Sequence, residues 1–275
     1  MDPTSHADRL VGLLRGYGRT LVAFSGGVDS SVVLAAAARA LGRGEVAALT
    51  AVSPALPAAG LDAAAEFCAT LGVVHHTVRT RELDRAGYRD NGPRRCYFCK
   101  STLLEEAVRV CAAEGYAVVA TGTNASDVAA GFRPGIRAAA ERGARTPLAD
   151  LGLDKEAVRG IARHWGLRTW DKPAAACLSS RIAYGVRITP ARLARVERAE
   201  AAARSLLPGV RDLRVRDLGE RVRLEVDAGA VPAARAHTGV RAAIRDAGFG
   251  DAPLAVEPFR SGSMNELLPD PSRWR

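Results

Sequence analysis

The stretch that decides the fold is Leu21-Val22-Ala23-Phe24-Ser25-Gly26-Gly27-Val28-Asp29-Ser30-Ser31. A short apolar run ends in a Ser-Gly-Gly turn, and a long apolar segment, residues 32–41, follows it. This order predicts a strand, a glycine turn and the start of a helix. Gly26 and Gly27 lack the Cβ atoms that would block close approach to the backbone. The free N–H groups that begin the helix therefore favour an anion. Hydroxyl groups add further donors: those of Ser25, Ser30 and Ser31.

Asp29 is the one acidic residue of this turn. A carboxylate repels a phosphate unless a cation lies between them, so we interpret Asp29 as a Mg²⁺ contact or as an acceptor that holds the turn. An ordinary turn capped by Asp29 is the simpler alternative. The stretch is not a Walker A loop, because it has no Gly-Lys-Ser and the first lysine is Lys100. It resembles the PP-loop of the ATP pyrophosphatase superfamily, whose members split ATP between the α- and β-phosphates and adenylate a substrate.

Composition describes a soluble globular chain of 275 residues, with 48% hydrophobic and 25% charged residues. Apolar runs are shorter than the roughly 20 residues that span a bilayer, and the N-terminus lacks a signal-peptide pattern. We therefore expect a cytoplasmic protein with no membrane partner. The net charge of +9 raises nucleic acid as a partner. However, the basic residues are mostly scattered arginines, so we expect a small anionic substrate and no nucleic acid.

Alternating strand and helix patterns over the first 80 residues predict a doubly wound parallel α/β sheet. The expected strands are 20–24, 45–52 and 73–78, and the expected helices are 29–41 and 61–71. A fourth strand, 116–120, runs into a loop rich in hydroxyl and amide groups. We expect nucleotide contacts in the turn and at the strand ends: Ala23, Phe24, Thr50, Val52, Gly122, Thr123, Asn124 and Asp127.

The pattern changes at Thr189, where an αββαβ order begins. We therefore expect a PP-loop domain over residues 1–188, which includes the cysteine loops, and a smaller α+β domain over 189–275 for substrate binding or oligomerisation. Arg214 and Arg216 alternate on one face of an expected half-exposed hairpin, so both can point at one anion. Glu200 and Glu225 could hold a second metal. The alternative is a solvated strand and helix.

Five cysteines, an odd number, argue against a disulfide framework. Cys68 and Cys111 fall inside expected helices and are interpreted as packing residues. Cys96, Cys99 and Cys177 fall in expected loops, and a helix is expected to begin only at 102. Three thiolates can hold a [4Fe–4S] cluster and leave its fourth iron open. A redox pair with an unrelated buried Cys177 is the alternative.

Five motifs together resemble the LarE family of sulfur transferases, in the expected order over nearly the whole chain. They are Ser-Gly-Gly-Val-Asp-Ser, Arg-Cys-Tyr-Phe-Cys-Lys, Thr-Gly-Thr-Asn-Ala-Ser-Asp, Phe-Arg-Pro-Gly-Ile-Arg-Ala and Lys-Pro-Ala-Ala-Ala-Cys-Leu-Ser-Ser-Arg-Ile. The resemblance implies a PP-loop, HUP-like fold and a homo-oligomer. It also implies that the chain uses ATP to adenylate the carboxylates of pyridinium-3,5-biscarboxylic acid mononucleotide. Sulfur would then be installed as thiocarboxylates for the nickel-pincer nucleotide cofactor.

The resemblance gives the residue matching Cys177 two uses. In single-cysteine members it attacks the acyl-adenylate and loses its own sulfur. In three-cysteine members it joins the Cys-x-x-Cys pair to hold a [4Fe–4S] cluster that carries sulfide. Cys96, Cys99 and Cys177 resemble the second type, and the sulfur donor stays open. Arg181 could hold the substrate's phosphate or second carboxylate, or lie on the surface.

Three rival functions remain from the residues alone. A PP-loop tRNA thiolase shares the loop, the three cysteines and the basic charge, but no added RNA-binding module or clustered basic face is visible. An amidating PP-loop enzyme that uses ammonia would not need the three cysteines. A nucleotide-binding module with a zinc knuckle is the non-enzymatic alternative. The PP-loop argues against it, because this loop is suited to pyrophosphate release.

Overall fold

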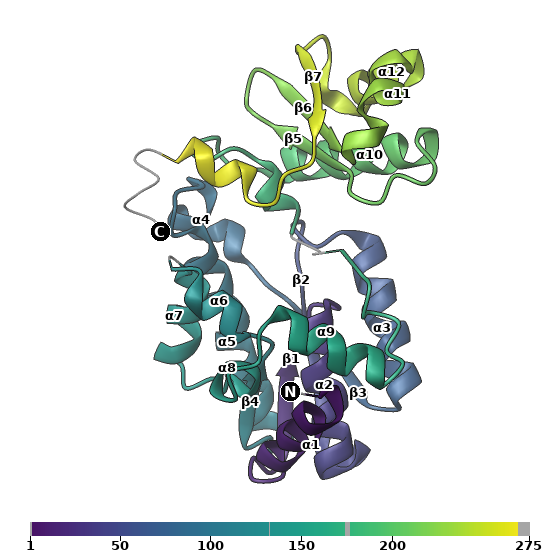
Figure 1. The fold of residues 1–275 in the computed structure, drawn as a ribbon. Helices are drawn as coiled ribbons and strands as arrows, with labels where there is room; N and C mark the ends of the chain where they lie inside the picture. Colours follow the sequence, from purple (N-terminus) through teal and green to yellow (C-terminus); the bar gives the residue numbers. More distant parts are fainter. Residues whose placement is uncertain (1, 132, 174–176, 269–275) are drawn as a thin grey trace. The chain divides into compact units, whose positions relative to one another are not determined.

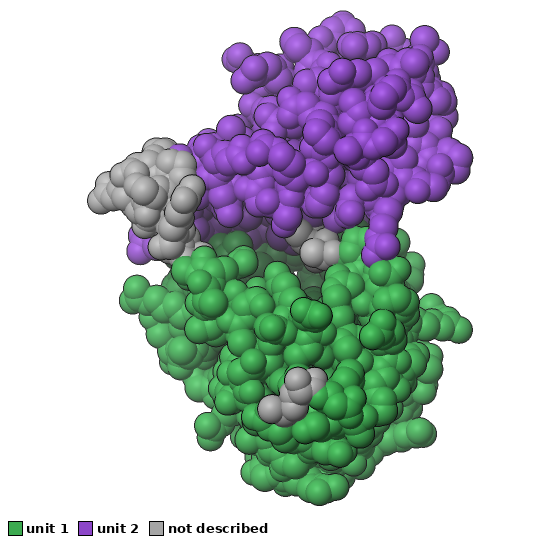
Figure 2. Space-filling view, viewed as in Figure 1, with its two compact units in different colours: residues 1–82, 96–175, 275 green, residues 83–95, 176–274 purple. Residues whose placement is uncertain are grey.

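The structure is a computed structural model that describes residues 2–131, 133–173 and 177–268. The chain forms two compact units (Figure 2). Within the described ranges, the first unit comprises residues 2–82 and 96–173, and the second comprises 83–95 and 177–268. This division differs from the expected boundary after residue 188 in two ways. The second unit begins earlier along the chain, and it includes the distant segment 83–95.

The first unit is built on a four-stranded parallel sheet in the order β3-β2-β1-β4 (Figure 1). Its strands are β1 (Thr20–Ala23), β2 (Val46–Val52), β3 (Val74–Arg79) and β4 (Val118–Thr121). The chain winds outward from β1 to β3 and then returns to the other side of β1 for β4. Ligand loops of such sheets gather where the strand order reverses, which here is between β1 and β4. The prediction of a doubly wound parallel α/β fold is confirmed.

Helices cover both faces of this sheet. They are α1 (Pro3–Leu14), α2 (Val28–Leu41), α3 (Ala58–Leu71), α5 (Arg95–Glu114), α6 (Ala125–Ala129), α7 (Pro134–Glu141), α8 (Pro147–Asp150) and α9 (Lys155–His164). Successive strand residues face opposite sides. Val22 packs into the larger core with α1, α2 and α9, whereas Leu21 packs with Ala107 of α5 on the other face. The strand that carries the glycine turn is thus buried on both sides.

Helix α5 begins earlier than the sequence indicated. We expected a helix from 102, with the Cys-x-x-Cys pair in the preceding loop. The helix instead starts at Arg95, so Cys96 and Cys99 lie in its first turn. Gly92 and Pro93, which predicted a loop, end just before this turn.

The second unit carries a three-stranded sheet in the order β5-β6-β7. Its strands are β5 (Arg214–Asp217), β6 (Val222–Val226) and β7 (Leu254–Pro258), and its helices are α4 (Ala86–Arg89), α10 (Pro190–Leu206), α11 (Val231–Ala236) and α12 (Thr238–Ile244). The expectation of a half-exposed hairpin is wrong for β5, because all four of its residues are buried.

Segment 83–95 is tied to the second unit by hydrogen bonds. Asn91 adopts a left-handed backbone conformation, with φ 53°, and its Nδ2 donates to the carbonyls of Ala183 and Val186. The hydroxyls of Tyr88 and Ser179 lie 2.6 Å apart and both residues are buried. These contacts join residues about ninety positions apart, which no local pattern predicts. Along the described ranges, no helix is long and apolar enough to cross a membrane.

Candidate functional site

The PP-loop, residues 25–31, connects the buried end of β1 to α2. Gly26 has φ 69°, a backbone conformation that is unfavourable for residues with a Cβ atom, and Gly27 precedes the first helical residue. Ser30 holds the turn closed, because its Oγ donates to the Gly27 carbonyl at 3.1 Å and accepts from the N–H of Ser25. The N-cap residue is Gly27, which has no side chain that could form a capping hydrogen bond. Mg²⁺ binding by Asp29 and the simpler alternative, in which Asp29 only caps the turn, both stay predictions, and the N–H groups that begin the helix suit an anionic ligand.

Asp29 lies in the first turn of α2 and is oriented from another strand end. Its Oδ1 accepts a hydrogen bond from Nδ2 of Asn124 at 2.9 Å. Burial raises the pKa of Asp29, and the Asn124 bond partly offsets that shift. Asn124 is fully buried and caps α6, since its Oδ1 accepts from the N–H of Asp127 at 2.9 Å. Two predicted strand-end loops thus meet at one carboxylate.

Gly122 is the point of closest approach between the two loops. A Cβ on this residue would lie 2.7 Å from the amide nitrogen of Ser30 and 2.9 Å from the carbonyl carbon of Asp29. Such distances are too short for real contacts, so only glycine fits here. Ser31 lies beside them, fully buried, and its Oγ has no hydrogen-bond partner among the described residues. A buried hydroxyl without a partner is costly, and a bound phosphate could satisfy it.

The end of β2 supports the loop from the other side. Thr50 is buried, and its hydroxyl donates to the carbonyl of Phe24 at 2.9 Å and accepts from Nε2 of His75 at 2.8 Å. Burial lowers the pKa of His75 and so favours the neutral form of its imidazole. Thr50 therefore holds β1 in place, and its direct contact with a nucleotide stays a prediction. Val52 is half-buried at the end of the strand, and Ala23 and Phe24 are buried.

Lys172 contacts the PP-loop, and the sequence interpretation missed it. Its Nζ donates to the carbonyl of Gly26 at 2.9 Å. The two residues lie 146 positions apart. The available signal was compositional, because Lys172 is one of only three lysines in a chain with 39 basic residues.

The five cysteines divide as the sequence suggested. Cys68 is buried, which raises the pKa of its thiol to about 11, and burial also raises the pKa of Cys111. Both shifts suit packing residues, because the thiolate is the reactive form. Cys96 is exposed and Cys99 half-buried in the first unit, while Cys177 is exposed in the second. None of the five cysteines, all of which lie in the described ranges, forms a disulfide.

Four of the predicted charged residues of the second unit form two buried ion pairs. Arg181 pairs with Glu200, with Nε 2.9 Å from Oε1, and its guanidinium also donates to the carbonyl of Cys177. Arg216 pairs with Glu225, with Nη2 2.7 Å from Oε2. Arg181 thereby holds the backbone that carries the Cys177 thiol. It is only 4% exposed, so the surface alternative for Arg181 is wrong.

Both glutamates have further partners within the second unit. Glu200 also accepts from the N–H of Val215, and Glu225 accepts from the hydroxyl of Ser263. Arg214 is buried as well, and burial lowers the pKa of its guanidinium. The solvated alternative is therefore excluded for these side chains, whereas metal ligation by Glu200 and Glu225 stays a prediction.

Comparison with known proteins identifies the family. The profile of the asparagine synthase family matches residues 14–177. The pyridinium-3,5-bisthiocarboxylic acid mononucleotide synthase of Lactiplantibacillus plantarum is 33% identical over 265 residues, which cover 94% of this chain and 93% of that protein. The chain belongs to the LarE family of PP-loop proteins. An uncharacterized protein of Synechocystis is 40% identical over 253 residues, 91% of this chain and 93% of its own length.

Membership of the LarE family makes this chain an ATP-utilising enzyme of the PP-loop superfamily. The structure brings together the predicted residues of the first unit around α2: the PP-loop, Gly122, Asn124 and Asp127. Among the described residues, no group of three or more histidines, cysteines, aspartates or glutamates forms a metal site. Cys96 and Cys99 belong to one unit and Cys177 to the other, so the three-thiol interpretation stays a prediction.

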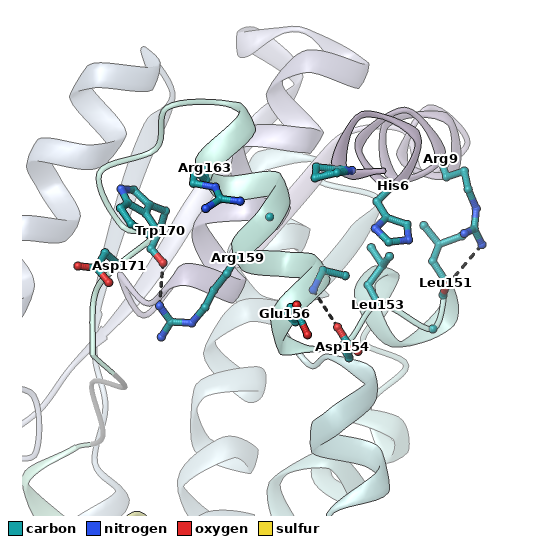
Figure 3. Close-up of a pocket in the computed structure, with 14 residues that line it drawn as sticks. His6, Arg9, Leu151, Leu153, Asp154, Glu156, Arg159, Arg163, Trp170 and Asp171 are labelled. Atoms are coloured by element: carbon teal, nitrogen blue, oxygen red, sulfur yellow. Dashed lines mark hydrogen bonds between the residues drawn. The ribbon is translucent and has the colours of Figure 1, made fainter. Parts of the chain in front are cut away.

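A separate cavity of about 910 Å³ lies in the first unit of this LarE-family chain (Figure 3). Helix α1 contributes His6 and Arg9, and α9 contributes Arg159 and Arg163. None of the predicted site residues lines it. In its lining, Arg159 donates to the carbonyl of Trp170 at 2.7 Å and so holds the segment that follows α9 (Figure 3).

Proposed function

We propose that this protein is an ATP-dependent sulfur transferase that converts the carboxylates of pyridinium-3,5-biscarboxylic acid mononucleotide to thiocarboxylates. The observation that carries the proposal is the full-length similarity to a pyridinium-3,5-bisthiocarboxylic acid mononucleotide synthase. The asparagine synthase match supports only the ATP chemistry, because it ends at residue 177. The product would serve the nickel-pincer nucleotide cofactor.

Adenylation solves the first chemical problem, since a carboxylate oxygen is a poor leaving group. A substrate carboxylate oxygen attacks the α-phosphorus of ATP, and the bond to the bridging oxygen of the β-phosphate breaks. The N–H groups that begin α2 stabilise the negative charge that develops on pyrophosphate. The glycine turn lets these groups reach the phosphates, and the unpartnered Ser31 hydroxyl supports a phosphate at this place.

Asp29 suits a role as Mg²⁺ ligand. Its carboxylate is partly desolvated, which raises its pKa, and Asn124 orients one of its oxygens. A bound Mg²⁺ would neutralise phosphate charge beside this carboxylate. The protein's contribution is to hold Asp29 at a fixed distance from the α2 N-terminus.

Sulfur transfer forms the second half-reaction. A sulfide sulfur attacks the activated carbonyl carbon, the carbon–sulfur bond forms, and AMP leaves with the electron pair of the broken carbon–oxygen bond. Cys96, Cys99 and Cys177 are not joined by disulfides and are not fully buried, and three thiolates can hold a [4Fe–4S] cluster with one iron left open. Such a cluster would supply an open iron to carry sulfide. Arg181 holds the Cys177 carbonyl and keeps the thiol's backbone in position.

The substrate's phosphate needs cationic partners, and we propose Arg214 and Arg216 for it. Desolvation by burial lowers the pKa of Arg214, and the positive charge of Arg181 lowers it further. A bound anion would therefore be stabilised beside Arg214. Glu200 and Glu225 would bind a second metal only by exchanging arginine partners. We also propose a homo-oligomer in the cytoplasm, on family resemblance.

Anaerobic purification tests the proposal. Iron and acid-labile sulfide are measured, and the same sample is assayed with ATP on the pyridinium mononucleotide and on unfractionated tRNA. We expect iron with sulfide, and thiocarboxylate formation only on the mononucleotide. Thiolation of tRNA would favour the tRNA thiolase, and ammonia-dependent amide formation would favour the amidating enzyme. Zinc without iron and sulfide would exclude the cluster.

A further inference from the structure

The segment that follows α9 carries a cation onto the PP-loop. Lys172 donates from Nζ to the carbonyl of Gly26 at 2.9 Å. Its backbone is fixed on both sides, because its N–H donates to the carbonyl of Thr169 and its carbonyl accepts from Arg159 at 3.1 Å. Arg159 also holds Trp170 (Figure 3). The lysine is thus presented from a supported loop.

Lys172 contacts the PP-loop at Gly26, whereas Asn124 contacts it at Asp29. Gly26 has Ala64 and Gly60 of α3 as its other near neighbours, whereas Gly122 and the Asn124 loop approach the turn at residues 29 and 30. A cavity of about 270 Å³ begins at Gly26 and Lys172 and continues between α3 and residues 166–169. A phosphate group bound at the Gly26–Gly27 turn would therefore lie near Lys172.

The charge of Lys172 has no acidic partner among the described residues. An ammonium group has three donors, and one of them goes to the Gly26 carbonyl. Burial lowers the pKa of Lys172, because desolvation disfavours its charged form. A partly desolvated cation without a counter-ion is stabilised by a bound anion.

We propose that Lys172 binds the pyrophosphate portion of ATP and stabilises the charge that develops on it during adenylation. This inference rests on the proposed ATP chemistry of the same loop. The Gly26–Gly27 turn is followed directly by the N–H groups of α2, which we propose bind pyrophosphate. A cation hydrogen-bonded to Gly26 would therefore lie close to the same phosphates. Lys172 at Gly26 and a Mg²⁺ ion bound at Asp29 would then act on the same leaving group.

The test compares binding of inorganic pyrophosphate and of AMP, each with Mg²⁺, by calorimetry. Lys172→Met should weaken pyrophosphate binding about tenfold or more and leave AMP binding within about twofold, because a charge-assisted hydrogen bond is lost at one ligand only. Lys172→Arg should restore most of the affinity. In ATP turnover, Lys172→Met should lower kcat for pyrophosphate release more than it raises KM.

Arg168→Met is the matched control. Arg168 lines the same cavity, but it is exposed and pairs with Glu66 on the surface. This variant should bind both ligands as the parent does. Unchanged pyrophosphate binding in Lys172→Met, or an equal loss of AMP binding, would overturn the proposal. If Lys172 proves necessary for pyrophosphate while the parent protein never thiolates the pyridinium nucleotide, only the proposed function fails.

Discussion

Asn124 donates a hydrogen bond from Nδ2 to Oδ1 of Asp29 across 2.9 Å, which joins the β4–α6 loop to the first turn of α2. The same amide uses its oxygen to cap α6. One buried side chain therefore fixes both a helix start and the orientation of the acid in the PP-loop. The first two predictions below concern Asp29 and Asn124, the two residues of this hydrogen bond.

Asp29→Asn should separate activity from stability. We expect pyrophosphate release to fall about a hundredfold or more, since the carboxylate that would hold Mg²⁺ is lost. Burial raises the pKa of Asp29, so the folded state binds a proton more tightly than the unfolded state. Stability from this group is present at low pH and is lost as pH rises through the raised pKa. At pH 7 the variant should thus melt at the same or a higher temperature, measured by thermal unfolding at several pH values. A melting temperature several degrees lower would contradict this.

Asn124→Ala should shift the pH dependence of adenylation. The Asn124 hydrogen bond lowers the pKa of Asp29, so its loss raises that pKa further. The acidic limb of the pH–rate profile should therefore move to higher pH. The lost cap should also cost about 1 kcal/mol. Asp154→Ala is the control, because it removes the cap of α9 at similar cost and does not contact Asp29. If both variants had the same pH–rate profile, Asn124 would have no influence on the pKa of Asp29.

Gly122→Ala should displace the PP-loop. The added Cβ would lie 2.7 Å from the amide nitrogen of Ser30, and backbone atoms cannot rotate away. We expect a loss of about 1–3 kcal/mol in the free energy of unfolding and weaker ATP binding. Gly44→Ala should change unfolding by less than about 0.5 kcal/mol, because nothing lies within 4 Å of its Cβ position. Urea unfolding measures the stability of each variant, and ATP titration measures its affinity for ATP. If Gly122→Ala and Gly44→Ala had the same stability and the same affinity, the close approach at Gly122 would have no consequence.

Cys177→Ala should abolish thiocarboxylate formation and retain pyrophosphate release. Arg181 holds the backbone carbonyl of Cys177, which alanine keeps, so the loop should stay in place. Cys111→Ala, in a half-buried helical position, should retain both activities. Pyrophosphate and product are quantified in single turnovers. Loss of both steps in Cys177→Ala would assign this residue to adenylation.

Much of the first unit was predictable because its signals are local. The apolar run at 20–23, the glycine turn and the apolar helix 28–41 need only near neighbours to define strand, turn and helix. The cysteines followed the same logic, since a helical position among apolar residues already indicated that Cys68 is buried. Charged residues were predicted less well. Arg214 and Arg216 suggested a half-exposed strand, but both are buried, and the ion pair with Glu225 allows this for Arg216.

The sequence by itself determined that an anion-binding turn links a buried strand to a helix, and which thiols are candidates for chemistry. Only the tertiary structure decided which distant residues meet that turn. Asn124 and Lys172 reach it from 95 and 146 positions away. Segment 83–95 joined the second unit for the same reason. Glycine turns and periodic apolar residues act through adjacent backbone, whereas these pairings depend on strand order and helix packing, which arise from the whole core.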